Sequence, residues 1–256
     1  MGKPVLLIWH SESSLWIGFH RQELPQWVSP GAAYDSWEAP SYQYHLTDRG
    51  TLKRIEQWIG AKRWTTKLLW LHTPVGEGTS AIAQAVAKTC AEHGQLLASF
   101  FFSRYSRGRN SRKHLFPTIA FQICMSLPHK REKLRGMLQD DSYIAYRRVS
   151  DSIDLLVSLF SDHPGTPPDG QATGSSPFLV IIDSLDKCQG DNDQSIILSD
   201  VRDLLYKHRL PLLFLITSRP KSHIRETFEE PVMSSLTEVV ELGADSDFRT
   251  RRFPYT

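Results

Sequence analysis

Phosphate-binding chemistry is indicated by the segment 71–80, which reads LHTPVGEGTS. It joins a short apolar run to a helical pattern, the context in which the phosphate loop G-x-x-x-x-G-K-[ST] occurs. Gly76 and Gly78 let the backbone turn its N–H groups toward an anion, and the following helix presents its positive end. Ser80 stands at the hydroxyl position that ligates magnesium. Taken alone the match is weak, because glycine turns of this kind that bind no ligand are common.

Two positions of this loop depart from the pattern. Thr73 stands where the first glycine is expected, and Thr79 stands where the lysine is expected. A charge-assisted hydrogen bond of the kind that this lysine makes contributes about 1.5–3 kcal/mol, so its loss predicts an affinity at least about tenfold lower. Glu77 adds a negative charge nearby. The loop therefore predicts weakened nucleotide binding.

A carboxylate follows the buried run 178–182, where Asp183 ends an apolar strand. An acidic residue at the carboxyl end of such a strand faces the phosphate loop and holds magnesium, directly or through water. Asp186, three positions on, is a candidate to orient an attacking water, whereas Lys187 cannot act as a carboxylate base. The alternative is that Asp183 caps a strand and Asp186 is solvated.

An arginine follows the apolar run 212–216, in the sequence Thr217-Ser218-Arg219-Pro220. Two roles are open for Arg219: sensing a γ-phosphate, or forming a structural ion pair with an acidic group such as Asp183. Because the carboxyl ends of parallel strands meet at one edge of a sheet, the loop, the acidic strand end and this polar strand end are predicted to converge there.

The elements that would position these residues alternate along the chain. Apolar runs that are buried on both faces and separated by amphipathic helices indicate a parallel sheet covered on both sides. Strands are predicted at 68–71, 97–102, 178–182, 212–216 and 236–242, and helices at 47–59, 80–91, 115–127, 153–160 and 195–206.

Five segments in series resemble the NACHT domains of fungal STAND proteins, also called nephrocystin-type N-terminal domains. They are 71–84, ASFFFSR at 98–104, FPTIAFQ at 116–122, VIIDSLD at 180–186 and FLITSRP at 214–220. The resemblance covers about residues 45–242. It implies a three-layer α/β P-loop NTPase fold with a five-stranded parallel sheet of order 5-1-4-3-2. It further implies binding of ATP or GTP with Mg²⁺, in a switch whose nucleotide state controls opening and oligomerisation.

The resemblance also places functional roles on individual residues of this chain. Lys187 stands where the family has a glutamate, which together with Thr79 predicts weak or absent hydrolysis. The predicted nucleotide-binding residues are Pro74, Gly76, Gly78, Thr79, Ser80 and Arg219; the predicted metal ligands are Ser80 and Asp183; the candidate catalytic residue is Asp186.

The predicted organisation is an irregular N-terminal extension over 1–45, a NACHT-type domain over 46–245 and a truncated tail over 246–256. The winged-helix region and the repeats that follow such domains are absent from this sequence, so a non-functional fragment is one alternative. A pseudo-NTPase that serves as a protein-interaction scaffold is another. Both alternatives keep the fold and lose the activity.

The composition of the chain limits the classes of partner that are expected. The net charge of +2 does not predict nucleic-acid or membrane binding, and no apolar run approaches the roughly 20 residues of a membrane span. The basic loop 104–113 is interpreted as solvated and not as a nucleic-acid site. The three cysteines are expected to be reduced thiols of a cytoplasmic protein. The expected partners are a nucleotide and other proteins, including further copies of the chain.

Overall fold

A computed structural model gives the architecture of the chain. Statements about structure refer to the residues that it describes, which are 28–36, 48–61, 63–73, 78–134, 153–161 and 178–242.

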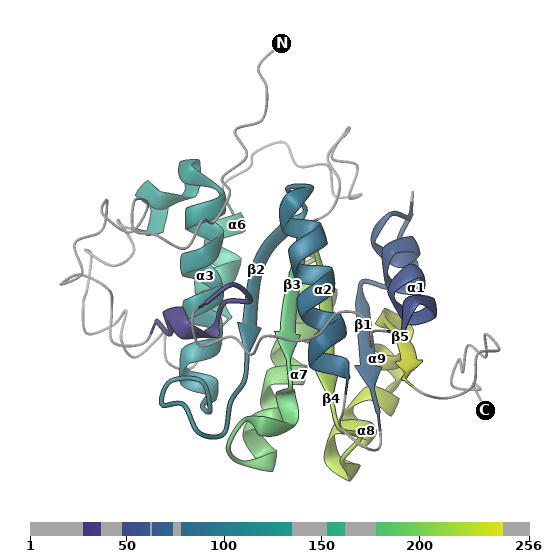
Figure 1. Cartoon of the computed structure of the whole chain (residues 1–256). Coiled ribbons are helices and arrows are strands. Elements are labelled where there is room, and N and C mark those ends of the chain that lie inside the picture. The colour runs from purple at the N-terminus through teal and green to yellow at the C-terminus, as the bar shows by residue number, and fades with distance from the viewer. Residues whose placement is uncertain are drawn as a thin grey trace.

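A five-stranded parallel sheet forms the centre of the molecule (Figure 1). The strands are β1 (Leu68–His72), β2 (Leu96–Phe101), β3 (Phe178–Asp183), β4 (Leu212–Ser218) and β5 (Thr237–Glu241). Their order is β2-β3-β4-β1-β5, which confirms the predicted order 5-1-4-3-2 and the three-layer α/β fold. Each neighbouring pair is parallel, so all carboxyl ends lie along one edge. The predicted site residues after β1, β3 and β4 are thereby brought to that edge.

Burial explains why the strands were recognisable in the sequence. Every residue of β1 and β4 is buried, because both strands are covered on both faces and have neighbours on both sides. Strands in such positions read as continuous apolar runs. The edge strand β5 is only half-buried and mixes Thr and Glu with valines. Each of the five strands lies within one or two residues of its predicted range.

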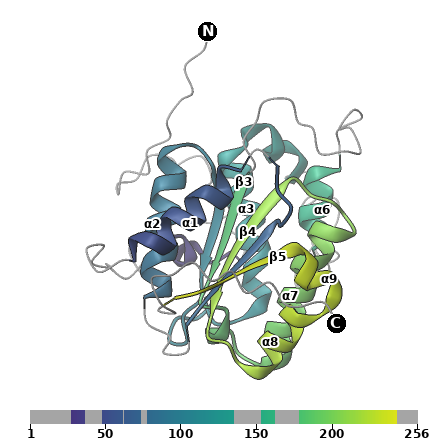
Figure 2. The ribbon, with the colours of Figure 1, turned by 90° about the vertical axis from the view of Figure 1, so that its right-hand side faces the viewer.

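Helices cover the two faces of the sheet (Figure 2). On one face, α1 (Arg49–Ile59) and α2 (Thr79–Glu92) pack through an apolar cluster that includes Ile55, Trp58 and Ile82. The other face carries α3 (Leu115–Ser126), α6 (Asp154–Phe160), α7 (Asp191–Tyr206), α8 (Ser222–Glu229) and α9 (Pro231–Leu236). The described residues also form four 3₁₀ turns: η2 (Pro30–Ala32), η4 (Arg112–His114), η5 (Pro128–Lys130) and η6 (Leu185–Lys187).

The helices α8 and α9 were not predicted. Their combined segment is short and is interrupted by Pro231, so it lacks a sustained helical period. The packing of Phe228 holds α8 in place, because its ring stacks on the Trp70 ring of β1 with centroids 4.2 Å apart. The helix α7 was predicted but begins at Asp191 rather than at Ser195, directly after Gly190 in a positive-φ conformation.

Part of the predicted N-terminal extension packs on the domain. The Ser29 backbone N–H donates to the Thr118 hydroxyl at 2.9 Å, and the Tyr34 N–H donates to the Ser99 hydroxyl at 3.0 Å. Ala32, between them, is fully buried. The rest of the extension and the tail 246–256 lie outside the described residues. Within the described part of the chain, no helix has the length and apolar character to cross a membrane.

Candidate functional site

The Asp183 carboxylate is the centre of a cluster of hydroxyl groups at the carboxyl edge of the sheet. Its Oδ2 atom accepts hydrogen bonds from Ser80 Oγ at 2.7 Å and Ser184 Oγ at 2.8 Å, and its Oδ1 atom accepts one from Thr217 Oγ1 at 2.6 Å. We refer to these four residues as the hydroxyl cluster. It unites α2, β3 and β4, and it brings together Ser80 and Asp183, the two predicted metal ligands.

Local backbone geometry builds the hydroxyl cluster. Ser184 has a left-handed conformation (φ 58°), which few residues other than glycine adopt and which turns the chain sharply out of β3. Its N–H donates to Thr217 Oγ1 at 2.8 Å, so that hydroxyl both accepts from Ser184 and donates to Asp183. Burial raises the pKa of Asp183, and the three hydroxyl donors oppose that rise. Keeping this carboxylate ionised is therefore costly, and the three hydroxyl donors offset part of that cost.

The start of α2 lies beside this cluster. Gly78 is the N-cap residue with φ 87°, a conformation that favours glycine, and a β-carbon on it would approach Leu242 Cδ2 to 3.0 Å, so the Leu242 side chain would have to shift. Thr79 is buried, with 5% of its surface exposed, at the first position of the helix. The predicted ligands Pro74 and Gly76 lie outside the described residues.

A second carboxylate, Asp186 on η6, is bound by two arginines. Asp186 Oδ2 lies 3.6 Å from Arg104 Nη2 and 3.8 Å from Arg219 Nε, and its Oδ1 accepts the Arg219 backbone N–H at 3.2 Å. We call these three residues the arginine clasp. The partner of Arg219 is thus Asp186 and not Asp183, whose oxygens already accept three hydroxyl protons. The alternative that Asp186 is solvated is also wrong, because only 5% of its side chain is exposed.

Three residues of these two groups were not identified from the sequence as site residues. Ser184 directly follows β3, and Thr217 is the second-last residue of β4; a polar residue at the carboxyl end of a buried strand is a signal that could have found them. Arg104 was assigned to the basic loop. That loop is not uniformly solvated as expected: Arg109 is 5% exposed, because its Nε donates to the Phe101 carbonyl oxygen at the end of β2.

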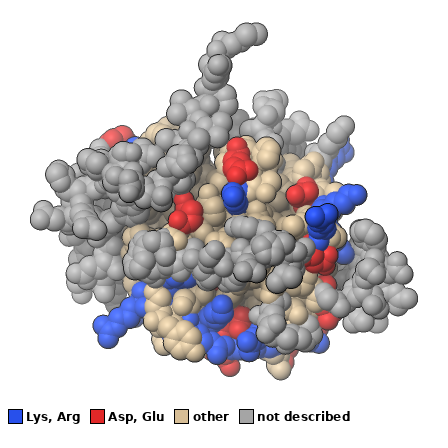
Figure 3. Space-filling model, viewed as in Figure 1, with Lys and Arg blue, Asp and Glu red and all other residues tan. Residues whose placement is uncertain are grey.

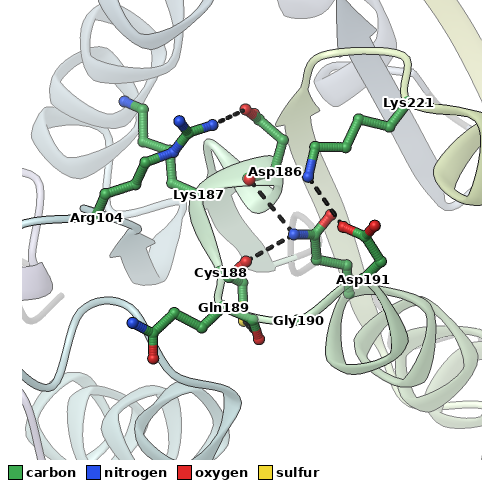
Figure 4. Close-up of a pocket in the computed structure, with 9 residues that line it drawn as sticks. Arg104, Asp186, Lys187, Cys188, Gln189, Gly190, Asp191 and Lys221 are labelled. Atoms are coloured by element: carbon green, nitrogen blue, oxygen red, sulfur yellow. Dashed lines mark hydrogen bonds and ion pairs between the residues drawn. The ribbon is translucent and has the colours of Figure 1, made fainter.

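A cavity of about 360 Å³ opens next to the arginine clasp (Figure 4). Residues of η6 and of the start of α7 line this cavity. Three cationic side chains reach the cavity from different elements. Two of these are paired: Arg104 with Asp186, and Lys221 with Asp191 at 3.1 Å. The third is Lys187. The residues that line the cavity are Arg104, Asp186, Lys187, Cys188, Gln189, Gly190, Asp191, Gln194 and Lys221.

The donor atoms of the hydroxyl cluster fit a magnesium ion. Mg²⁺ takes oxygen ligands, uses one or two carboxylates and completes its shell with water and substrate phosphate oxygens. Ser80 Oγ and Asp183 Oδ2, 2.7 Å apart, are one such hydroxyl and one such carboxylate oxygen. No group of three or more His, Cys, Asp or Glu side chains that could hold a metal occurs among the described residues. Magnesium would therefore need phosphate and water oxygens as further ligands.

Comparison with known proteins identifies a related family. Residues 51–219, more than half of the chain, match the family model described as nephrocystin 3, N-terminal. No curated protein matches the chain. Among solved structures, that of the Aeropyrum pernix ORC1 protein in complex with DNA is similar, with 17% sequence identity and a TM-score of 0.43. The alignment covers 77% of this chain and 45% of the ORC1 chain, and a likeness at this level carries no inference about function.

Proposed function

We propose, from the premise that the chain belongs to the nephrocystin 3 N-terminal family, that it is a nucleotide-binding P-loop module of the NACHT type. In this proposal it binds ATP or GTP with Mg²⁺, hydrolyses the nucleotide weakly or not at all, and acts in the cytoplasm as the switch of a STAND signalling protein. Protein partners, including other copies of the chain, would read its nucleotide state.

The contact between Ser80 and Asp183 is the observation that carries this proposal. Ser80 is the second residue of α2, and Asp183, which ends β3, follows it 103 positions later in the chain. Their 2.7 Å hydrogen bond joins the hydroxyl position of the phosphate loop to the acidic strand end. A fold maintained only as a scaffold has no need to bury a carboxylate among hydroxyls at this edge, since burying a charge is costly.

The division of roles follows from the chemistry of the side chains. Ser80 and Asp183 would hold magnesium, which supplies positive charge between phosphate oxygens. The left-handed Gly78 and the N-terminus of α2 would direct backbone N–H groups to the phosphates. Pro74 and Gly76 belong to the same proposed loop. The γ-phosphate role of Arg219 would require that residue to leave Asp186, to which its side chain is bound by a long 3.8 Å contact.

Weak hydrolysis is proposed for two reasons. Thr79 is neutral and buried, so it cannot place a positive charge on the phosphates. Asp186, the candidate to orient water, has its carboxylate between Arg104 and Arg219. Turnover above background that disappears in an Asp183→Ala variant would overturn this part of the proposal.

Calorimetry tests the proposal directly. ATP and GTP are titrated into the protein with Mg²⁺ and with EDTA, and binding in the micromolar to sub-millimolar range is expected with Mg²⁺. The Asp183→Asn variant keeps the size of the side chain and should lose the effect of Mg²⁺. No heat of binding at millimolar nucleotide would favour the alternative that the chain is a scaffold that binds no nucleotide.

The substitution Thr79→Lys restores the missing charge. It should lower the dissociation constant for the nucleotide at least about tenfold, because one charge-assisted hydrogen bond contributes about 1.5–3 kcal/mol. The matched control is Thr89→Lys, which adds the same charge far along α2. An unchanged constant for Thr79→Lys would mean that the segment 71–80 is not a phosphate site.

A further inference from the structure

The phosphate site of this chain lacks its usual cation. Asp183 contributes a negative charge, whereas Ser80, Ser184 and Thr217 are neutral, and Thr79 occupies the position of the lysine. A nucleoside triphosphate carries several negative charges, and a site of this composition repels it until magnesium or another cation is present. A cation supplied from elsewhere in the fold would remove this conflict.

Three of the four nearby cationic side chains already have partners. Arg104 and Arg219 contact Asp186, and Lys221 contacts Asp191 at 3.1 Å. Lys187 differs from them: its side chain makes no hydrogen bond or ion pair with any residue that the structure describes. It is half-buried, so its charge is less screened than that of an ordinary surface lysine.

The fold places Lys187 beside the strand end that bears Asp183. The left-handed Ser184 turns the chain back on itself, and the Lys187 N–H closes the η6 turn by donating to the Ser184 carbonyl oxygen at 2.8 Å. In Figure 4 the Lys187 amino group points away from the Asp186 carboxylate, with the Arg104 side chain beside it. Burial raises the pKa of Asp183, and the positive charge of Lys187 is among the causes that lower it. The η6 turn therefore fixes Lys187 beside the carboxyl end of β3, at the same edge of the sheet as the hydroxyl cluster.

Lys and Arg side chains are numerous on the surface near this edge. In Figure 3 their atoms, with some Asp and Glu atoms among them, lie over the lower part of the molecule, the side toward which the strand arrowheads of Figure 1 point. A basic edge raises the local concentration of a polyanion and speeds its association.

We propose that Lys187 supplies the positive charge for the nucleotide phosphates, in place of the loop lysine whose position Thr79 fills. The inference rests on the proposed function, since it names the residue that makes phosphate binding feasible in this chain. Two departures of the sequence from the family pattern, at Thr79 and at Lys187, are then coupled: the first removes a lysine from the start of α2, and the second installs a lysine after β3.

A double-mutant cycle at positions 79 and 187 tests this inference by calorimetry with ATP and with AMP. Lys187→Ala should weaken ATP binding at least about tenfold, the effect of one lost charge-assisted contact, and should change AMP binding less because fewer phosphates are contacted. Lys187→Arg should retain most of the affinity. In the Thr79→Lys background the same Lys187→Ala change should cost less than about threefold, because the restored lysine supplies the charge.

Lys221→Ala is the matched control, since Lys221 lines the same cavity but is paired with Asp191. It should change the dissociation constant less than about threefold, and the thermal midpoints of all variants check folding. Equal losses in Lys187→Ala and Lys221→Ala, or no loss in either, would overturn the inference and leave the proposed function intact. Binding by Thr79→Lys but not by the natural chain would also overturn it. No binding by either protein would overturn the proposed function itself.

Discussion

Two carboxylates three residues apart, Asp183 and Asp186, are stabilised in opposite ways. Among the described residues, the hydrogen-bond donors to the oxygens of Asp183 are all neutral hydroxyl groups. Asp186 faces two guanidinium groups whose side chains are about half exposed, 52% for Arg104 and 54% for Arg219. The hydroxyl cluster thus keeps a carboxylate whose charge is not balanced by a fixed cation in contact with it. The arginine clasp contains a carboxylate that is already neutralised.

From this difference we propose a binding role for Asp183 and a structural role for Asp186. Hydroxyl donors can be replaced by a metal ion at little cost, because Ser80 can turn its oxygen toward the ion and remain a ligand. Guanidinium groups repel a metal ion, and Asp186 can act on a ligand only if an arginine moves. The metal and phosphate chemistry is therefore proposed at Asp183, and Asp186 is proposed to order the ends of β2 and β4.

The largest effect is expected from Thr217→Val, which disrupts the hydroxyl cluster. The substitution keeps the shape of the side chain but removes the acceptor of the Ser184 N–H and a donor to Asp183, both buried. Because unsatisfied buried groups each cost about 1–3 kcal/mol, we expect the free energy of unfolding to fall by about 2–3 kcal/mol in urea titrations.

Thr227→Val is the control for this prediction. Thr227 is also buried, but its hydroxyl only donates to the His223 carbonyl oxygen within α8, at 2.8 Å. Such a bond within a helix adds little stability, so the change should be close to neutral. Equal effects of the two substitutions would show that the hydroxyl cluster has no special role in stability.

The second prediction extends the comparison to a third carboxylate, Asp200, whose pKa is also raised by burial. Asp200 on α7 has a buried Oδ2 atom with no hydrogen-bond partner among the described residues, and burial raises its pKa to about 6. A carboxyl whose pKa is higher in the folded protein loses stability as pH rises, here from about 4 to 6. Asp200→Asn should therefore raise the free energy of unfolding at pH 7 by about 1–2 kcal/mol, after allowance for partial solvent screening.

Urea titrations at pH 7 and pH 4 check the sign, because the gain should be nearly absent at pH 4. The control is Asp203→Asn on the same helix. Asp203 accepts from Lys207 Nζ at 2.6 Å and Arg202 Nε at 3.1 Å, so its neutralisation should not stabilise the protein. A gain for Asp200→Asn that is equal at both pH values would exclude burial of the charge as its cause.

The smallest effect is expected at the arginine clasp. Asp186→Asn keeps an acceptor for the Arg219 N–H and removes only the charge, whose two partners are half exposed. Ion pairs with exposed partners contribute about 0–1 kcal/mol, so a loss of about 1 kcal/mol is expected in urea titrations. Adding Arg104→Ala to Asp186→Asn should cost little more. A loss above about 3 kcal/mol would show that the clasp is a tightly coupled buried ion pair.

The strands and the pairing of Ser80 with Asp183 were predictable from the sequence. Central parallel strands are buried on both faces, so their apolar runs are unbroken and their carboxyl ends must share an edge. The partner of Arg219 was not predictable in the same way. A flexible side chain reaches several acids near a strand end, and which one it contacts depends on the direction that the η6 turn gives to Asp186. The helix α8 was missed because its short amphipathic pattern depends on contact with Trp70.

The sequence by itself determined the class of fold, the strand order through its family resemblance, and the two departures at Thr79 and Lys187. Tertiary structure alone decided which groups surround each carboxylate, because those groups come from β2, β4 and α2 and meet only when the sheet forms. It also decided that Lys187, which reads in the sequence as a lost acidic residue, lies unpaired within the described part of the chain beside the strand end that bears Asp183. Sequence spacing fixes positions along a strand, whereas side-chain contacts across strands depend on packing.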